Sequence, residues 1–240
     1  MIGNDFDDIL QECGIPRSKG YHYYFQNYIF NEIDLTNKSI LDVGGGNGIA
    51  SFFATSQDDT CSSLVVDPID DGSNDLMLIQ YKKMRQHFAT KVDFFQGYTY
   101  DLSVNEKFDI ILLHNSINHV GEDIVSQLII DEKVRSEYKE RLQSILKFSA
   151  PGTILIVADC ARKNFWGDLN LRNPVAPTIE WILHQQPKVW TELLAELDCS
   201  HESTQWTARR EFGGMGKYLL ANRYCSYMLN SHFCSKYIVS

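Results

Sequence analysis

Short apolar runs alternate along the chain with longer segments in which hydrophobic residues recur every three or four positions. The first five short runs hold four to six residues rich in Ile, Leu, Val and Phe, which is typical of buried strands. This alternation predicts a parallel sheet that is covered by helices on both faces. The expected strands are 39–43, 63–66, 92–96, 108–113 and 153–158, followed by two more at 203–207 and 232–239.

The longer segments predict helices, because their apolar residues fall on one face at helical spacing. Residues 1–35 predict one or two further helices, with the aromatic segment 21–25 in the middle. Ala150-Pro151-Gly152 predicts the end of the longest helix. A long loop with three prolines follows the fifth strand, and a glycine-rich turn is expected at 213–216. The expected helices are 49–56, 75–88, 122–147, 188–197 and 217–229.

The charge balance bears on the class of partner. A net charge of −9 argues against a nucleic-acid partner, because phosphate binding needs clustered Lys and Arg. Solvated faces explain the dense basic runs at 82–85 and 209–210. The arginines are nonetheless the first candidates for contacts to an anionic substrate.

The cysteines and the apolar runs bear on the compartment. Six cysteines without a CxxC pair are typical of reduced thiols in a cytosolic protein. The N-terminal residues are acidic and lack the basic-then-apolar order of a signal peptide. No apolar run approaches the roughly 18 residues that a membrane span needs. These features predict a cytoplasmic protein without a membrane partner.

A glycine-rich loop follows the first expected strand, in the stretch KSILDVGGGNGIASFFA at residues 38–54. Glycine is needed where the backbone takes a positive φ or lies directly against a ligand, and the helix that follows offers free N–H groups. The dinucleotide frame G-x-G-x-x-G would put Ile49 in the place of its third glycine, so a nicotinamide oxidoreductase is disfavoured. The frame G-x-G-x-G fits Gly44, Gly46 and Gly48.

Residues 41–48, LDVGGGNG, resemble the first motif of the class I S-adenosylmethionine-dependent methyltransferases. The resemblance implies an α/β fold with a doubly wound, mostly parallel seven-stranded sheet, helices on both faces, an N-terminal helical cap and an insertion after the fifth strand. It implies one domain over 1–240, with the cap at 1–35, a cofactor-binding core at 39–160 and a substrate-covering segment at 160–240. The loop residues expected to bind S-adenosylmethionine are Asp42, Gly44, Gly45, Gly46, Asn47 and Gly48.

The second expected strand ends in Asp67-Pro68. The resemblance implies that the Asp67 carboxylate accepts both ribose hydroxyls of the cofactor beside Pro68, because two donors match two carboxylate oxygens. The alternative is an Asp-Pro helix cap. After the third strand the family often has Gly-Asp near the adenine. Here Tyr98 and Thr99 stand at that place, with Asp101 as the next acid, so the adenine contacts are assigned to Tyr98 and Thr99, with Asp101 as the alternative.

The segment HNSINHV at 114–120 follows the fourth expected strand, where open parallel sheets bind ligands. The resemblance implies that His114, Asn115 and Ser116 brace the cofactor and that Asn118 and His119 face the substrate. Histidine suits the removal of a proton from a hydroxyl nucleophile, so His119 is the candidate general base, with Asn118 beside it. The alternative for His119 is to cap the following helix or to orient Asn118.

Other candidates for substrate contacts lie at the two ends of the chain. Tyr21 and Tyr24 belong to the N-terminal helices that would close over the substrate. Glu180 and His184 are four residues apart, so on a helix they would share a face and bind substrate or pair with each other. Trp190, which follows them, is assigned to the core.

No metal is expected, because hard divalent ions prefer oxygen ligands. In the family's metal-dependent members both the fourth and the fifth strands end in acidic ligands. Here Asp159 ends the fifth strand, but His114 and Asn115 end the fourth.

These features predict methyl transfer from S-adenosylmethionine to a small-molecule acceptor, at oxygen rather than nitrogen, with S-adenosylhomocysteine as product. A nucleic-acid or protein methyltransferase is disfavoured by the acidic balance and by the lack of an Asn-Pro-Pro-Tyr/Phe type of tetrapeptide in the loop at 114–120. A non-catalytic binding module that retains the cofactor fold stays open as an alternative. The oligomeric state is not predicted.

Overall fold

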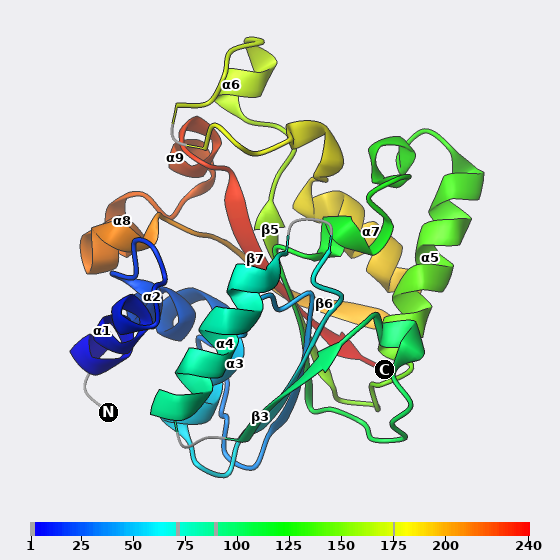
Figure 1. Ribbon diagram of the computed structural model, residues 1–240. Helices are drawn as coiled ribbons and strands as arrows, with labels where there is room; N and C mark the ends of the chain where they lie inside the picture. The colour runs from blue at the N-terminus through cyan, green and yellow to red at the C-terminus, as the bar shows by residue number, and fades with distance from the viewer. Residues whose placement is uncertain (1–2, 71–72, 89–90, 175) are drawn as a thin grey trace.

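In the computed structural model, which describes residues 3–70, 73–88, 91–174 and 176–240, seven strands form one sheet in the order β3-β2-β1-β4-β5-β7-β6 (Figure 1). The first five strands pair in parallel, and β7 is antiparallel to both β5 and β6. The predicted doubly wound, mostly parallel sheet is therefore confirmed. The strands are β1 (Ser39–Val43), β2 (Ser62–Asp67), β3 (Lys91–Gln96), β4 (Ile110–His114), β5 (Ile154–Cys160), β6 (Cys199–Trp206) and β7 (His232–Val239).

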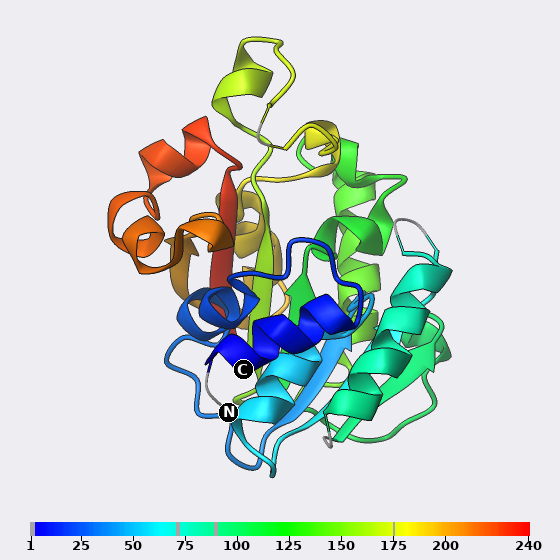
Figure 2. The same ribbon diagram turned by 60° about the vertical axis from the view of Figure 1, so that its left-hand side comes forward.

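Helices cover both faces of the sheet because successive strand residues point to opposite sides (Figures 1 and 2). Ile40 of β1 packs in the cluster on one face, and its neighbour Leu41 packs in the cluster on the other. The first face carries α1 (Gly3–Glu12), α2 (Tyr21–Tyr24), the π-helical turn η1 (Phe25–Ile29), α3 (Ile49–Gln57) and α4 (Asp75–His87). The second face carries α5 (Glu132–Leu146) and α7 (Pro187–Ala195).

The N-terminal helical cap and the insertion after β5 are both present. The cap contains α1, α2 and η1, and the aromatic segment 21–25 lies at its centre as expected. Residues 161–174 and 176–186, called the strap below, connect β5 to α7 and contain α6 (Phe165–Asp168) and the 3₁₀ turn η5 (Trp181–Leu183). The division of the chain at residues 35, 39 and 160 stays a prediction.

The expected helix at 122–147 is wrong in its first third. The α-helix begins only at Glu132, because the side chain of Asp131 accepts hydrogen bonds from the N–H groups of Lys133 (2.8 Å) and Val134 (3.3 Å) and so caps it. The preceding residues form two 3₁₀ turns, η3 (Ile117–Gly121) and η4 (Val125–Gln127), which bury Ile117 and Val125. Apolar periodicity alone does not separate such turns from a continuous helix.

The C-terminal region also departs from expectation. The expected helix at 217–229 is two helices, α8 (Gly213–Leu219) and α9 (Arg223–Met228), because Asn222 caps the second one. The glycines expected to form a turn at 213–216 instead begin α8, which follows the short turn η6 (Arg210–Phe212). The strand expected at 203–207 begins earlier, at Cys199. It is an edge strand in which the successive residues 200–204 are exposed, so its polar residues concealed its length.

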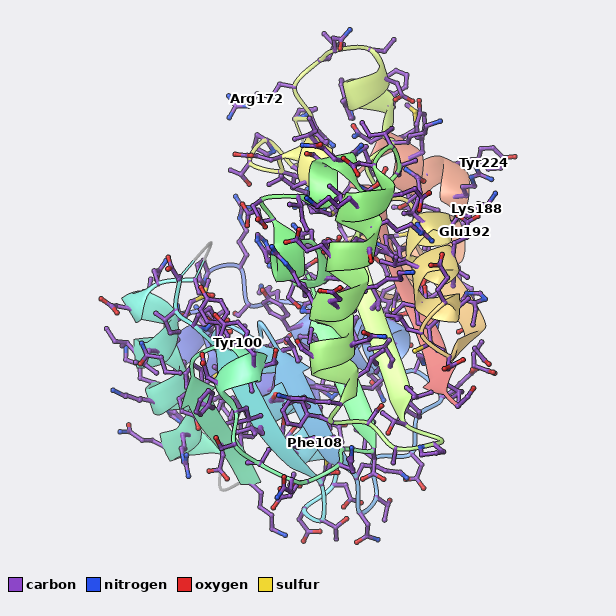
Figure 3. All side chains as sticks on the ribbon, turned by 90° about the vertical axis from the view of Figure 1, so that its right-hand side faces the viewer. Tyr100, Phe108, Arg172, Lys188, Glu192 and Tyr224 are labelled. Atoms are coloured by element: carbon purple, nitrogen blue, oxygen red, sulfur yellow. The ribbon has the colours of Figure 1, made fainter. Side chains whose placement is uncertain are left out.

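The outer face of α7 is polar, and its inner face packs in the core. Trp190 of α7 is fully buried as expected, whereas Lys188 and Glu192 form an ion pair of 3.6 Å on the outer face of the same helix (Figure 3). Arg172 of the strap and Tyr224 of α9 point outward at the end of the molecule that carries α6. Within the described residues, no helix has the length and apolar character needed to cross a membrane.

Candidate active site

The glycine loop, residues 44–48, turns sharply between β1 and α3. Gly44, Gly46 and Gly48 have φ angles of +66°, +56° and +75°, a region that favours glycine. A Cβ on Gly44 would lie 2.6 Å from the Cβ of Ser116, so this position is closed by its neighbours. A Cβ on Gly46 would meet only the Met77 sulfur at 3.2 Å, because Gly46 borders an open cleft.

That cleft, called the glycine cleft below, has a volume of about 950 Å³ and lies at the carboxyl ends of β1 to β4. The order of the strands reverses between β1 and β4, and ligands bind at such a point in open α/β sheets. Gly48 is the one expected cofactor residue that does not line the glycine cleft; a Cβ on Gly48 would instead meet the Val65 side chain at 3.1 Å. The expected cofactor residues that line the cleft are Asp42, Gly44, Gly45, Gly46, Asn47, Asp67, Pro68, Tyr98, Thr99, His114, Asn115 and Ser116.

Asp42 lies beneath the loop and is 1% exposed. Its Oδ2 accepts a hydrogen bond from the Ser51 hydroxyl at 2.7 Å, whereas its Oδ1 has no partner among the described residues. Burial raises the pKa of the Asp42 carboxyl to about 6; the hydrogen bond from Ser51 opposes this shift and the charge of Asp67 adds to it. A buried acceptor atom at the edge of the cleft is therefore available to a donor.

Asp67 ends β2 and holds the loop in place. Its Oδ2 accepts hydrogen bonds from the N–H of Gly46 at 2.7 Å and from the Ser73 hydroxyl at 3.0 Å, and its Oδ1 accepts one from the N–H of Ile69 at 2.8 Å. Asp67 thus fixes the backbone of the loop while its carboxylate lines the cleft. The residue after it, Pro68, does not start a helix, because α4 begins at Asp75.

Two aromatic rings border the cleft after β3. The rings of Tyr98 and Tyr100 stack with their centroids 5.1 Å apart and an angle of 8° between their planes. Figure 3 shows Tyr100 near the ends of the strands, and it is a site residue that the sequence reasoning missed. Asp101 is not among the described residues that line the cleft; its carboxylate accepts a hydrogen bond from the N–H of Tyr98 at 3.4 Å.

A second cavity of about 720 Å³ adjoins the glycine cleft, and four histidines line it, so it is called the histidine cavity below. Five residues line both spaces: Tyr21, His114, Asn115, His119 and Glu122. Every residue expected to act in catalysis or to bind substrate lines the histidine cavity, namely Tyr21, Tyr24, Asn118, His119, Glu180 and His184.

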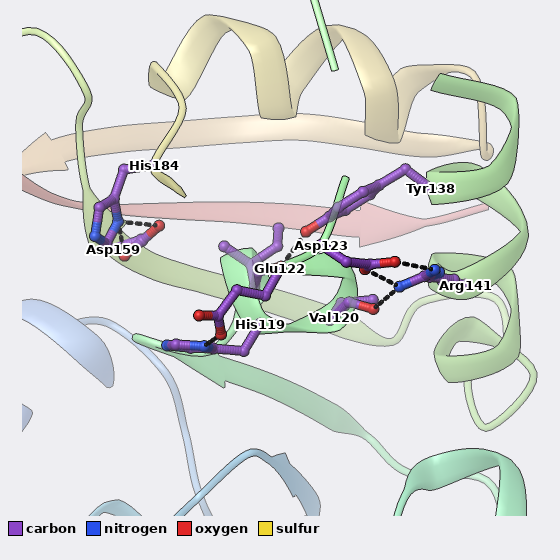
Figure 4. A network of polar contacts seen from close by, with 9 residues as sticks. His119, Val120, Glu122, Asp123, Tyr138, Arg141, Asp159 and His184 are labelled. Carbon is purple, nitrogen blue, oxygen red and sulfur yellow. Dashed lines mark hydrogen bonds and ion pairs between the residues drawn. The ribbon is translucent and has the colours of Figure 1, made fainter. Parts of the chain in front are cut away.

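His119 stands at the junction of the two spaces, in the turn η3. Its Nδ1 is hydrogen-bonded to Oε2 of Glu122, and both side chains are partly exposed (Figure 4). The partner of its side chain is therefore Glu122 rather than Asn118, and α5 begins well beyond it at Glu132. Asn118 is 2% exposed, and its Oδ1 has no partner among the described residues.

His184 pairs with Asp159 and not with Glu180. Its Nδ1 lies 3.0 and 3.2 Å from the two carboxylate oxygens of Asp159, which is the next-to-last residue of β5 (Figure 4). The expected helix face shared by Glu180 and His184 is wrong, because only 181–183 form a short 3₁₀ turn between them. The strap turns His184 back towards the sheet instead.

A chain of hydrogen bonds joins the cap, the loop after β4 and β7. The Tyr24 hydroxyl bonds Nε2 of His114 at 3.1 Å, and Oδ1 of Asn115 bonds Nε2 of His232 at 3.0 Å. Nδ1 of His232 bonds the hydroxyl of Thr207 at 3.0 Å. Burial lowers the pKa of His114 to about 4, with a smaller contribution from the charge of Arg210. Burial also lowers the pKa of His232 to about 3, with smaller contributions from His114 and His184. Both imidazoles are neutral near pH 7.

Arginines line the side of the histidine cavity that faces the cap. The Arg210 guanidinium lies 4.0 Å from the centroid of the Tyr21 ring and donates to the carbonyl oxygen of Arg17 at 3.0 and 3.3 Å. Arg209 pairs with Glu211 at 3.4 Å. The run at 209–210 therefore lies at the cavity and not on a purely solvated face. No cluster of three or more His, Cys, Asp or Glu side chains suited to a metal ion occurs in the described part of the chain.

Comparison with known proteins gives likenesses of structure alone. No protein-family model matches the chain, and no curated protein matches it in sequence. Among solved structures, the chain is similar to the O-methyltransferase family 2 protein from Planctomyces limnophilus, in complex with apigenin, with 12% identity and a TM-score of 0.59. That match covers 100% of this chain but 62% of the Planctomyces protein, so this chain spans less than two thirds of that protein's length.

Two other structures match over more of their own length. The 1,6-didemethyltoxoflavin-N1-methyltransferase from Burkholderia thailandensis, with S-adenosylhomocysteine bound, has 12% identity and a TM-score of 0.58 over 100% of this chain and 87% of that one. The magnesium protoporphyrin IX methyltransferase from Synechocystis, with S-adenosylmethionine bound, has 9% identity and a TM-score of 0.53 over 99% and 79%. The chain has the fold of the class I S-adenosylmethionine-dependent methyltransferases.

Proposed function

We propose that the protein transfers a methyl group from S-adenosylmethionine to a hydroxyl group of a small molecule. The observation that carries this proposal is the position of the His119–Glu122 pair, which lines both the glycine cleft and the histidine cavity. A group at this junction can reach a donor molecule in one space and an acceptor molecule in the other. The cofactors named with the similar Burkholderia and Synechocystis structures support the identity of the donor.

The glycine cleft fits S-adenosylmethionine in its shape and its polar groups. Gly46 leaves backbone open to the cleft, and Asp67 presents a carboxylate that suits two vicinal hydroxyls. The unpartnered Oδ1 of Asp42 suits a donor group of the ligand, and the Tyr98 ring suits the flat adenine. When bound, the cofactor supplies a methyl group on a positively charged sulfur, which needs no further activation.

His119 would act as the general base. Glu122 holds the Nδ1–H, so Nε2 of His119 is left to accept the proton of the acceptor hydroxyl. The hydroxyl proton would pass to Nε2 of His119 as the acceptor oxygen takes the methyl group that the bound cofactor would supply, and S-adenosylhomocysteine would remain as the second product. Tyr21 and Tyr24 of the cap would exclude water from the reacting groups.

An oxygen acceptor is favoured over a nitrogen acceptor by this pair. A neutral amine is a nucleophile without loss of a proton, whereas a hydroxyl gains from a base in reach. The net charge of −9 also disfavours nucleic acid as the acceptor. A cofactor-binding module without catalysis is the alternative, and it would bind S-adenosylhomocysteine without turning over any acceptor.

The test combines binding and turnover. Calorimetry should give a dissociation constant for S-adenosylhomocysteine in the wild type and no binding of NAD. Asp67→Ala should weaken the binding of S-adenosylhomocysteine by about 1.5–3 kcal/mol. Methyl transfer from labelled S-adenosylmethionine is then followed with hydroxylated aromatic compounds, beginning with apigenin, which the Planctomyces protein binds. His119→Gln should lose turnover by about 10²–10⁴-fold and keep its affinity for S-adenosylhomocysteine.

Absence of S-adenosylhomocysteine binding in the wild type would overturn the cofactor assignment. Full activity of His119→Gln would leave the reaction standing but remove His119 as the base. Binding without transfer to any of these acceptors would favour the non-catalytic alternative.

A further inference from the structure

The histidine cavity contains a second histidine–carboxylate pair, built like the first. In both pairs Nδ1 of a histidine faces a carboxylate: Glu122 for His119, and Asp159 for His184 (Figure 4). The first pair comes from the turn after β4, and the second joins the end of β5 to the strap. A single proton acceptor is enough for a methyl transfer to oxygen, so the second pair is not explained by the reaction itself.

The second pair is the more rigid of the two. The side chains of His184 and Asp159 are 13% and 1% exposed, against 37% and 38% for His119 and Glu122. The backbone of the strap is fixed at this point, because Nε of Arg162 donates to the carbonyl oxygen of His184 at 2.9 Å. The Asp159 carboxylate holds Nδ1–H, so Nε2 of His184, which has no partner among the described residues, is an acceptor.

Two amide oxygens of the cavity also lack donors. Oδ1 of Asn118 and Oδ1 of Asn230 are buried and have no hydrogen-bond partner among the described residues. A buried acceptor without a partner costs free energy, which a ligand bearing O–H or N–H groups would recover. Together with the Nε2 atoms of the two histidines, these oxygens make the cavity rich in acceptors that a bound molecule must serve.

The cavity is lined by charges of both signs, since the carboxylates of Glu122, Asp159, Glu180 and Glu211 lie in its wall together with three arginines. Arg17, Arg209 and Arg210 line the side that faces the cap, and Arg17 and Arg210 have no carboxylate within 4.0 Å among the described residues. Hydroxyl groups provide neutral donors to these acceptor atoms, and Tyr21 and Tyr24 add aromatic side chains to the lining of the cavity.

We propose that the acceptor is an aromatic molecule with at least two hydroxyl groups, and that His184, oriented by Asp159, binds the hydroxyl that is not methylated. The proposal rests on the proposed function for the identity of the reacting hydroxyl at His119. In this proposal His184 selects the acceptor, because His184 binds a hydroxyl group away from the reacting oxygen. His119 removes a proton, and His184 receives a hydrogen bond.

The test uses matched ligands that differ by one hydroxyl. Catechol and phenol give a pair with adjacent positions, and 4′,7-dihydroxyflavone and 7-hydroxyflavone give a pair with distant ones. Dissociation constants are measured by calorimetry with and without S-adenosylhomocysteine, so no turnover is needed. In at least one pair the wild type should bind the dihydroxy member about tenfold more tightly, which is the ratio that one good hydrogen bond provides.

His184→Gln should reduce that preference to less than about twofold and leave the affinity for the monohydroxy member unchanged. His119→Gln is the matched control and should keep the preference while it loses turnover. Because His184 lines the histidine cavity and not the glycine cleft, an unchanged dissociation constant for S-adenosylhomocysteine reports that the variant is folded.

A His184→Gln variant that keeps the preference, or a wild type that shows none in either pair, would overturn the proposal. Failure of S-adenosylhomocysteine to bind the wild type would instead overturn the proposed function, and the ligand pairs measured without it would still test His184.

Discussion

Two buried histidines tie the stability of the protein to pH. The pKa values of His114 and His232 are lowered to about 4 and about 3 from a usual 6.5, mainly by burial. The folded state therefore favours their neutral forms, whereas the unfolded chain takes up protons below about pH 6.5. Since the unfolded state then binds more protons, the free energy of unfolding should fall as the pH drops from about 6.5 towards 4. Asp42 acts in the opposite direction, because its raised pKa of about 6 makes the folded state bind a proton more tightly.

Comparison of the wild type with His232→Gln isolates one histidine from these opposing groups. A glutamine can keep a donor and an acceptor but cannot take up a proton in this range. Between about pH 7 and pH 4.5 the wild type should lose about 2–3 kcal/mol more than the variant, because two pKa units are spanned below 6.5. Urea unfolding at the two pH values measures this difference, and equal losses in the two proteins would contradict it.

The positions of single residues could be predicted where a sequence motif fixes them. They could not be predicted where only tertiary contacts fix them. Asp67, Gly44, Gly45 and Gly46 follow from a short strand–loop–helix pattern, so their position in the cleft could be predicted from local sequence. Asp159 was considered only as a metal ligand, because its partner His184 lies 25 residues away on an irregular strap. His232 was missed for the same reason, since it meets Asn115 across 117 residues.

At the scale of elements, the loop between β1 and α3 separates two roles of glycine. Gly44 is closed by Ser116, whereas Gly46 borders the glycine cleft. Gly46→Val should therefore abolish S-adenosylhomocysteine binding, because its side chain would occupy ligand space. Its folded state should lose only about 1–2 kcal/mol, the cost of a positive φ in a residue with a Cβ. Calorimetry and denaturant unfolding measure the two effects.

Gly44→Val is the matched control for this loop. Its Cβ would meet Ser116 at 2.6 Å, so it should lower the free energy of unfolding more than Gly46→Val does. Retained ligand affinity in Gly46→Val would mean that the ligand does not lie against this part of the backbone.

The elements themselves could be predicted in proportion to how regular they are. β1 and β7 begin and end where their apolar runs do, and the runs for the other parallel strands fall within two residues of their ends. The long helix failed because the 3₁₀ turns before Asp131 bury residues at nearly helical spacing. The presence of the strap could be predicted from its prolines, but its path could not, because hydrogen bonds from side chains rather than a repeating backbone pattern set that path.

At the scale of the whole molecule, Arg162 connects the strap, which carries His184 into the lining of the histidine cavity, to η4 and to the end of β5. It follows β5, and its guanidinium donates to the carbonyl oxygens of His184 at 2.9 Å, of Ser126 at 3.3 Å and of Ile182. It thereby joins the strap to η4, although Arg162 and Ser126 are 36 residues apart in the sequence. None of these contacts involves the glycine cleft.

Removal of Arg162 should therefore weaken ligand binding in the histidine cavity but not in the glycine cleft. Arg162→Ala should weaken the binding of hydroxylated aromatic ligands about tenfold or more and speed amide hydrogen exchange in the strap, because three carbonyls, two of them in half-buried hydrogen bonds, lose their donor. The affinity for S-adenosylhomocysteine should change by less than about twofold. Arg172→Ala is the control from the same strap, since among the described residues its exposed side chain donates only to the Pro177 carbonyl, at 3.3 Å. Equal losses of affinity for both ligands in Arg162→Ala would show that the strap supports the whole end of the sheet rather than the histidine cavity alone.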